Sequence, residues 1–155
     1  MNADPLVRRW FPGTLSQAES DAQAARVQAH IGAHGFGFWA VEVPGIAPFI
    51  GFVGLQHVRF AAAFTPAVEI GWRLAGAYWG QGYATEAARA ALAYAFGPLG
   101  LDGVVSFAVV GNTPSRRVME RIGMRHCPDE DFDHPDLPAD SPLRHHAFYR
   151  IRRPA

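Results

Sequence analysis

Residues 68–95, VEIGWRLAGAYWGQGYATEAARAALAYA, contain two regular elements joined by a glycine-rich loop. From Val68 to Leu74 apolar side chains alternate with polar or small ones, which is the period of a β-strand whose two faces differ in environment. From Thr85 to Ala95 small apolar residues recur at helical spacing, and Gly97-Pro98 ends the pattern. The stretch therefore predicts a strand, a turn and an α-helix in immediate succession.

The loop between these elements has the features of an anion-binding turn. Gly80 and Gly82 would let the backbone approach a ligand closely, and the first amides of the following helix have no intrahelical acceptors. These amides lie at the positive end of the helix dipole, so they favour a group such as pyrophosphate. The same glycines are also typical of a plain tight turn. The two common nucleotide signatures are absent, because the chain contains no lysine and no full G-x-G-x-x-G.

Composition limits the classes of protein to consider. A chain of 155 residues has the length of one domain, so we predict a single domain over residues 1–155. Fourteen basic residues balance fourteen acidic ones without a basic run, which argues against nucleic-acid binding. The single Cys127 excludes an internal disulfide and suits a reducing compartment. Without an apolar run of membrane-spanning length or a signal peptide, the expected location is the cytoplasm, with no membrane partner.

The rest of the chain adds further elements around this centre. Ser16 and Glu19 form a capping box for a helix reaching about His34. Two strands are expected before the central strand, at Phe36–Val43 and Pro48–Val58. After it we expect a strand at Gly103–Val109, a helix from Asn112 to Ile122, a short strand from Met124 and a last strand at His146–Arg152. The first three strands would form an antiparallel meander. A right-handed crossover would make Gly103–Val109 parallel to the central strand.

Two sequence blocks resemble one known family. Trp79-Gly80-Gln81-Gly82-Tyr83-Ala84 is similar to the acyl-CoA pyrophosphate loop of the GNAT N-acetyltransferases, written [Q/R]-x-x-G-x-[G/A]. Residues 112–124 resemble the family's N-x-x-S-x-x-x-x-E-x-x-G-[FM] segment. Trp79 departs from the general pattern in the way common in the branch of ribosomal-protein-alanine N-acetyltransferases (RimJ/RimL-like). The resemblance covers about Asn2 to Arg152, but the strand and helix with which members normally begin are not recognised, so we expect a late start or a missing sheet edge.

The resemblance implies a fold and an acyl donor. The expected fold is α/β (α+β), a GNAT-like mixed, mostly antiparallel sheet with a splayed central parallel strand pair, flanked by helices. Acetyl-CoA is the implied cosubstrate, without a metal. Its pantetheine arm would lie between the parallel strands. The implied acetyl-CoA contacts are Trp72, Arg73, Leu74, Trp79, Gly80, Gln81, Gly82, Tyr83, Ala84, Thr85, Asn112, Ser115 and Arg117. For Asn112 and Ser115 plain helix capping is the alternative.

Acetyl transfer to an amine requires a base and stabilisation of the oxyanion and thiolate. Glu69, on the central strand, is the candidate general base; its alternative role is a structural carboxylate paired with Arg73 or another arginine. Many family members carry a tyrosine seven residues after the asparagine, but this chain has Met119 there. Tyr149 is the candidate acid in its place, with Tyr83 and solvent as alternatives.

The acceptor side is less well marked in the sequence. His57 and Arg59, at the end of a strand, and Asp133 and His134, in the acidic loop 128–143, are the candidate acceptor contacts. This loop has three interpretations: a solvated surface loop, a flap that attracts a cationic amine, or a calcium loop. In the last, His134 stands where glycine is required, so we expect no metal there.

The sequence thus predicts an N-acetyltransferase that moves an acetyl group from acetyl-CoA to a primary amine by direct attack in a ternary complex. The acceptor would be a protein N-terminus or a small-molecule amine. A non-catalytic acyl-CoA-binding module or sensor is the alternative. Exposed sheet edges also make a homodimer reasonable.

Overall fold

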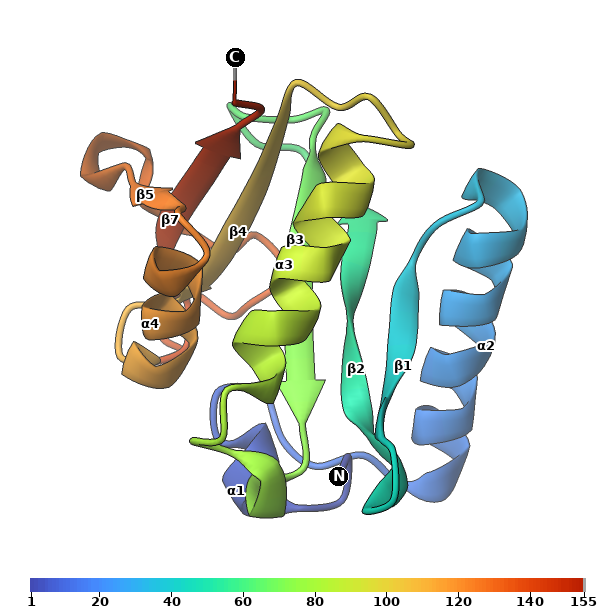
Figure 1. Cartoon of the computed structure of the whole chain (residues 1–155). Helices are drawn as coiled ribbons and strands as arrows, with labels where there is room; N and C mark the ends of the chain where they lie inside the picture. The colour runs from blue at the N-terminus through green and yellow to red at the C-terminus, as the bar shows by residue number, and fades with distance from the viewer. Residues whose placement is uncertain (155) are drawn as a thin grey trace.

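The computed structural model describes residues 1–154 and is built on one mixed sheet. Its strands lie in the order β1-β2-β3-β4-β7-β5, and β6 pairs with β7 (Figure 1). All neighbouring strands are antiparallel except β3 and β4. The predicted mixed, mostly antiparallel sheet with a central parallel pair is therefore confirmed.

The elements follow the predicted order closely. The strands are β1 (Phe38–Val43), β2 (Ala47–His57), β3 (Val68–Leu74), β4 (Gly103–Val109), β5 (Arg125–His126), β6 (Phe132–Asp133) and β7 (His145–Arg152). The helices are α1 (Pro5–Arg8), α2 (Gln17–His34), α3 (Tyr83–Phe96) and α4 (Thr113–Arg121), with 3-10 turns at Gly76–Tyr78 and Pro128–Glu130. None of the helices within residues 1–154 has the length and apolar character needed to cross a membrane.

Local capping accounts for the helix boundaries. Ser16 and Glu19 form the predicted capping box, and Gly35 ends α2 in the left-handed conformation. Helix α3 begins at Tyr83, two residues earlier than predicted, because Gly82 is its N-cap at a φ of 89°. Asn112 caps α4 by accepting a hydrogen bond from the backbone N–H of Ser115.

Helix α1 was not predicted. Asp4-Pro5 has the composition of a turn, but the side chain of Asp4 accepts a hydrogen bond from the Leu6 N–H at 2.8 Å and Pro5 occupies the first turn. This is an N-cap followed by the proline that a helix start tolerates. The segment before α2 therefore contains one helical turn.

The main core lies between the sheet and α3, which crosses in front of β2 and β3 (Figure 1). Small residues let the helix approach the strands closely, and α4 packs beside it on β4 and β5. The most deeply buried members of this core include Ile50, Leu55, Ile70, Ala88, Ala95, Val104 and Met119. Packing on this face fixes the relative positions of the two parallel strands and the helices that follow them.

Strands β3 and β4 share a single paired position, Glu69 opposite Val105. Next to it the hydroxyl of Ser106 donates a hydrogen bond to the carbonyl of Ile70 at 2.9 Å. Beyond this point the strands separate toward their carboxyl ends (Figure 1). The predicted splay is therefore present, and it opens a passage through the sheet.

Part of the acidic loop is held by contacts within the protein, although more than half of its residues are exposed. Asp131 accepts hydrogen bonds from the Phe148 N–H and lies 2.9 Å from Nε2 of His126, while Asp133 contacts Arg144 and His145. The carboxylates of Asp131 and Asp133 are therefore paired with other residues of the protein. In the described residues this loop contains no three-residue cluster of metal-ligating atoms, so the calcium interpretation gains no support.

Candidate active site

A cavity of about 850 Å³ occupies the passage between β3 and β4. This is within the range of small-molecule sites. One wall, here called the loop half, consists of Trp72, Leu74, the loop before α3, and α4 with its cap. The other, the carboxylate half, consists of Glu69 and residues from α1, α2, β2 and the loop at 134–137. Because side chains alternate along β3, Glu69 and Trp72 reach opposite faces of the sheet.

The loop half presents open backbone amides. Gly80 and Gly82 have φ values of 75° and 89°, and a Cβ at either position would meet nothing within 4 Å. Glycine is therefore needed for the backbone conformation rather than for space. Gly82 has no side chain to cap the 14-residue helix α3, so the N–H groups of residues 83–85 remain available to a ligand. The helix dipole makes this a favourable position for phosphate groups.

Trp79 anchors this loop to the end of β3. Its indole Nε1 donates to the carbonyl of Leu74 at 2.8 Å, and the guanidinium of Arg9 lies 5.7 Å from its ring centroid. A glutamine or arginine at this position could not place the same flat ring over the turn. Gln81 points away from the cavity and donates to the carbonyl of Ala77, so its side chain does not join the candidate site.

The backbone of Trp72 faces the passage. The carbonyls of Ile70 and Leu74 on the same edge of β3 accept hydrogen bonds from side chains, those of Ser106 and Trp79. Trp72 lies between them beyond the only paired position with β4, so its N–H and carbonyl point into the gap. This edge is available to a ligand with amide groups.

Asn112, Ser115 and Arg117 line the loop half from α4. The carboxamide oxygen of Asn112 caps the helix, and the hydroxyl of Ser115 accepts a hydrogen bond from the indole N–H of Trp72 at 3.0 Å. The capping role is thus realised, and both side chains still face the cavity. Arg121, which the sequence did not single out, lines the same wall.

Glu69 lies on the wall of the carboxylate half, and its Oε1 accepts a hydrogen bond from Nε2 of Gln56. Burial raises the pKa of this carboxyl group to about 7, while the Gln56 hydrogen bond and the positive charge of Arg59 act in the opposite direction. A carboxyl group with this pKa can accept and release a proton near neutral pH. Gln56 was missed because it becomes a neighbour of Glu69 only through the β2–β3 register.

The side chain of Arg73 lies outside the loop half. Its Nη1 donates to the side-chain oxygens of Asn2 and Gln23, at 3.1 and 3.3 Å, and its guanidinium lies 4.1 Å from the ring centroid of Phe11. Burial lowers its pKa to about 10. Among the described residues Arg73 forms no ion pair with Glu69. It ties the N-terminal segment and α2 to β3 instead.

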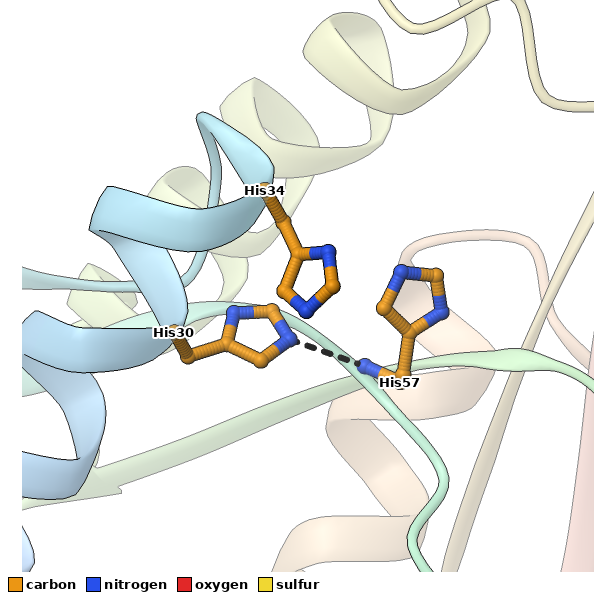
Figure 2. A group of neighbouring side chains, drawn as sticks. All are labelled: His30, His34 and His57. Atoms are coloured by element: carbon orange, nitrogen blue, oxygen red, sulfur yellow. Dashed lines mark hydrogen bonds between the residues drawn. The ribbon is translucent and has the colours of Figure 1, made fainter.

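Two of the four predicted acceptor contacts line the cavity. Arg59 and His134 do so, whereas Asp133 is directed to Arg144 and His145. The side chain of His57 lies against two histidines of α2 (Figure 2). The sequence missed several members of this wall, which come from distant segments: Arg9, Phe11, Gln23, Arg26, Phe38, Phe52, Phe107, Asp136 and Leu137.

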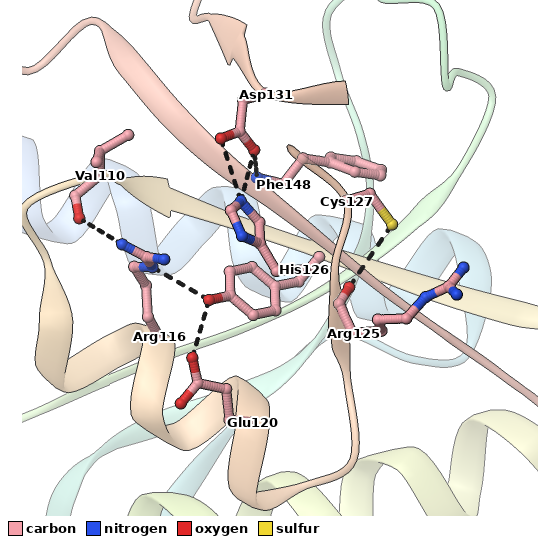
Figure 3. A network of polar contacts seen from close by, with 9 residues as sticks. Val110, Arg116, Glu120, Arg125, His126, Cys127, Asp131 and Phe148 are labelled. Carbon is pink, nitrogen blue, oxygen red and sulfur yellow. Dashed lines mark hydrogen bonds and ion pairs between the residues drawn. The ribbon is translucent and has the colours of Figure 1, made fainter. Parts of the chain in front are cut away.

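Tyr149, the predicted acid, lies outside the cavity. It is completely buried in β7, where its hydroxyl accepts a hydrogen bond from Arg116 Nε and donates to Glu120, both at 3.1 Å. Figure 3 shows Arg116 and Glu120 on α4 pointing toward this hydroxyl. Burial also raises its pKa. The hydroxyl is therefore part of a structural network on the far side of α4. Tyr83, by contrast, lines the cavity.

Comparison with known proteins agrees with this arrangement. Residues 1–125 match the model of the acetyltransferase (GNAT) domain. The chain belongs to the GNAT family. The resemblance found in the sequence is therefore confirmed. At the level of the family, the prediction of an acetyl-CoA-dependent acetyltransferase is confirmed as well.

The relatives of this GNAT chain span bacteria and fungi. The uncharacterized protein YkkB of Bacillus subtilis is 31% identical over 123 residues, which cover 79% of this chain and 70% of that protein. The FsC-acetyl coenzyme A-N(2)-transacetylase of Aspergillus fumigatus is 32% identical over 126 residues, which cover 74% of this chain but only 53% of that protein. This chain thus spans about half of the fungal enzyme.

Solved structures show the same GNAT fold. A GNAT-family acetyltransferase from Bacillus anthracis has a TM-score of 0.78 and 27% identity, covering 98% of this chain and 84% of that one. A ribosomal-protein-S5-alanine acetyltransferase from Vibrio fischeri has a TM-score of 0.71 and 19% identity, covering 96% and 84%. The likeness to the ribosomal-protein-alanine branch therefore extends to the fold.

Proposed function

We propose that the protein transfers an acetyl group from acetyl-CoA to a primary amine by direct attack in a ternary complex. The observation that carries this proposal is the position of Glu69. Its carboxyl group has a pKa of about 7 and lies where β3 and β4 begin to separate. On one side of it is the loop half, with the free N–H groups at the start of α3, and on the other is the carboxylate half. A binding module would not need a titratable group at this junction.

The loop half would hold the donor. The N–H groups of residues 83–85 would bind the pyrophosphate, and Arg117 would add positive charge from α4. The backbone of Trp72 would pair with the pantetheine amides and with the thioester carbonyl, in place of the strand pairing that β4 does not supply. A backbone N–H directed at this carbonyl also stabilises the oxyanion that forms during attack.

The chemistry would run through Glu69. The carboxylate removes a proton from the ammonium form of the acceptor, directly or through water, and the free amine attacks the thioester carbon. A C–N bond forms, the attacking nitrogen releases its second proton to solvent, the C–S bond breaks and the CoA thiolate leaves. General base catalysis of this kind contributes about 10² to 10⁴ in rate. Because Tyr149 lies outside the cavity, the proton that the thiolate finally takes would come from Tyr83 or solvent.

The charges of the carboxylate half favour an acceptor that carries an anionic group besides its amine. Arg26 and Arg59 line this wall. Three of the six carboxylates of the acidic loop, those of Glu130, Asp131 and Asp133, are directed to partners within the protein. The loop would thus contribute His134 and Asp136 to the wall without forming the strongly acidic flap that the sequence suggested. An amino acid or a similar carboxylate-bearing amine fits this charge pattern better than a polyamine.

The test combines binding with turnover. Acetyl-CoA affinity would be measured by calorimetry, and thiol release would be followed over pairs of amines that differ only by a carboxylate, together with N-terminal peptides. We expect Glu69→Gln to bind acetyl-CoA within about threefold of the wild type while kcat falls by about 10² to 10⁴. Glu42→Gln, on the exposed face of β1, is the matched control and should behave as wild type.

The outcomes separate the alternatives. Tight acetyl-CoA binding without thiol release for any amine would favour a sensor or binding module. An unchanged kcat in Glu69→Gln would remove Glu69 from the mechanism. Absence of acetyl-CoA binding in the wild type would contradict the proposal as a whole.

A further inference from the structure

We propose that His30, His34 and His57 form a binding site for a divalent transition-metal ion such as Zn²⁺. One ring nitrogen from each residue lies within 4.8 Å of the others. The ring centroids are 4.5 Å apart for His30 and His34, 4.7 Å for His34 and His57, and 5.7 Å for His30 and His57. Nitrogens bound to one Zn²⁺ at about 2.0–2.1 Å lie roughly 3.3 Å apart, so small ring rotations would complete the site.

The fold places the three rings around one space. His30 and His34 are four residues apart on α2 and therefore project from the same face of the helix. His57 is the last residue of β2 and faces them from the sheet (Figure 2). Three protein imidazoles leave a fourth tetrahedral position for water, which is a common arrangement for zinc. Imidazole also suits copper and nickel.

The hydrogen bonds of His30 prepare its ring for a metal. Its Nδ1 lies 2.8 Å from the carbonyl oxygen of Phe36, so this nitrogen carries the proton in the neutral ring and Nε2 presents its lone pair. Metal-ligating histidines usually donate their second N–H to such an acceptor. The Nε2 atom receives only a long contact of 3.4 Å from the backbone N–H of His57, which a metal ion would replace.

The surroundings give this site a structural role. None of the residues of α2 is fully buried, so little apolar packing holds the helix against the sheet. The spacing of Gln23, Val27, His30 and His34 puts them on one face of α2, and the first two line the cavity. A bound ion would therefore fix to β2 the same face of α2 that forms part of the carboxylate half. The positive charge of Arg59, near His30, opposes the binding of a cation.

The test uses the full chain with any histidine purification tag removed. Calorimetric titration with ZnCl₂ should show one ion per chain, and Co²⁺ should give the visible absorption bands of a tetrahedral or five-coordinate site. The double variant His34→Gln/His57→Gln, which alters two exposed rings, should bind Zn²⁺ about 100-fold more weakly or worse. His145→Gln is the matched control, because His145 is also exposed but pairs with Asp133 on β7.

Hydrogen exchange supplies a second readout that is independent of enzyme activity. Zn²⁺ should slow amide exchange in the last turns of α2 in the wild type and in His145→Gln, and EDTA should reverse the effect. The double variant should show no such slowing. The proposal is overturned if the wild type binds no Zn²⁺ at micromolar concentration, or if the double variant binds it as well as the wild type.

Discussion

The two halves of the cavity are built in different ways. The loop half comes from two short continuous stretches, residues 72–85 and 112–121, and offers mainly backbone groups: helix N–H groups, a free strand edge and glycines at positive φ. The carboxylate half collects side chains from α1, α2, β2, β3 and the 134–137 loop, and its chemistry depends on the burial of Glu69. A binding surface made from backbone thus tolerates sequence change outside its glycines, whereas one made from side chains of several separate segments depends on many distant partners.

Among the substitutions considered, one at Glu69 in the carboxylate half should have the largest effect, and the effect should appear in the free energy of unfolding. Its pKa is raised in the folded state from 4.5 to about 7, so the folded protein binds more protons than the unfolded chain between these pH values. The stabilisation is complete below pH 4.5 and is lost as the pH rises through 7. Glu69→Gln should therefore be more stable than wild type by up to about 3 kcal/mol at pH 8, and nearly equal near pH 4.5. Denaturant unfolding at both pH values measures this.

A stability difference that does not vary with pH would mean that Glu69 is not buried as an acid in the folded protein. The carboxylate half would then resemble an ordinary solvated surface, and the comparison between the two halves would lose its basis.

The loop half should be most sensitive at Gly82. Valine cannot adopt a φ of 89° without strain, so Gly82→Val should shift the start of α3 and displace its free N–H groups from the phosphates. Loss of one or two such charge-assisted hydrogen bonds weakens acetyl-CoA binding by about 100-fold. Calorimetry measures the affinity.

Gly100→Val is the control for strain alone. Gly100 has a φ of 61°, an added Cβ there would meet nothing within 4 Å, and the residue lies outside the cavity. This variant should lose stability but keep its acetyl-CoA affinity. Equal loss of affinity in both variants would show that the effect of Gly82→Val is general destabilisation.

Substitution of Arg59 should have a smaller effect, on the KM of the acceptor. In Arg59→Met, KM for carboxylate-bearing amines should rise by about 30-fold, because one hydrogen bond between charged groups is lost. KM for amines without a carboxylate and for acetyl-CoA should be unchanged, whereas the loss of the Arg59 charge would raise the pKa of Glu69 further and change kcat for all amines alike. Steady-state kinetics with matched amine pairs checks this, and Arg125→Met, on exposed β5, is the control. An equal rise in KM for both amines of a pair would contradict an anionic acceptor.

The sequence predicted the loop half well, because its signals are local. Glycine spacing, a cap and a helical period identify residues 79–85 and 112–121 without any long-range information. The start of α3 was misplaced by two residues, since the same glycines suit a longer turn. Helix α1 was missed because an aspartate followed by proline begins turns and helices alike.

The carboxylate half could not be predicted as well. Strand alternation placed Glu69 on the correct face, but only the β2–β3 register reveals Gln56 beside it. The side-chain partners of Arg73, Asn2 and Gln23, are distant in sequence and could not be recognised from it. Tyr149 looked like a usable acid because a sequence does not show that α4 covers its hydroxyl with Arg116 and Glu120.

If acetyl-CoA binds as proposed, the single pairing point between β3 and β4 would also limit the length of the acyl group that can be transferred. The hydrogen bond between Ser106 and Ile70 closes the narrow end of the passage, roughly 6.6 Å along the strand from Trp72. An acetyl group held at Trp72 would fit in front of this closure, whereas a longer acyl chain would press against it. The strands would then select for short acyl groups. Ser106→Ala should therefore reduce the ratio of kcat with acetyl-CoA to kcat with butyryl-CoA. An unchanged ratio of the two kcat values would mean that the hydrogen bond between Ser106 and Ile70 does not limit acyl length.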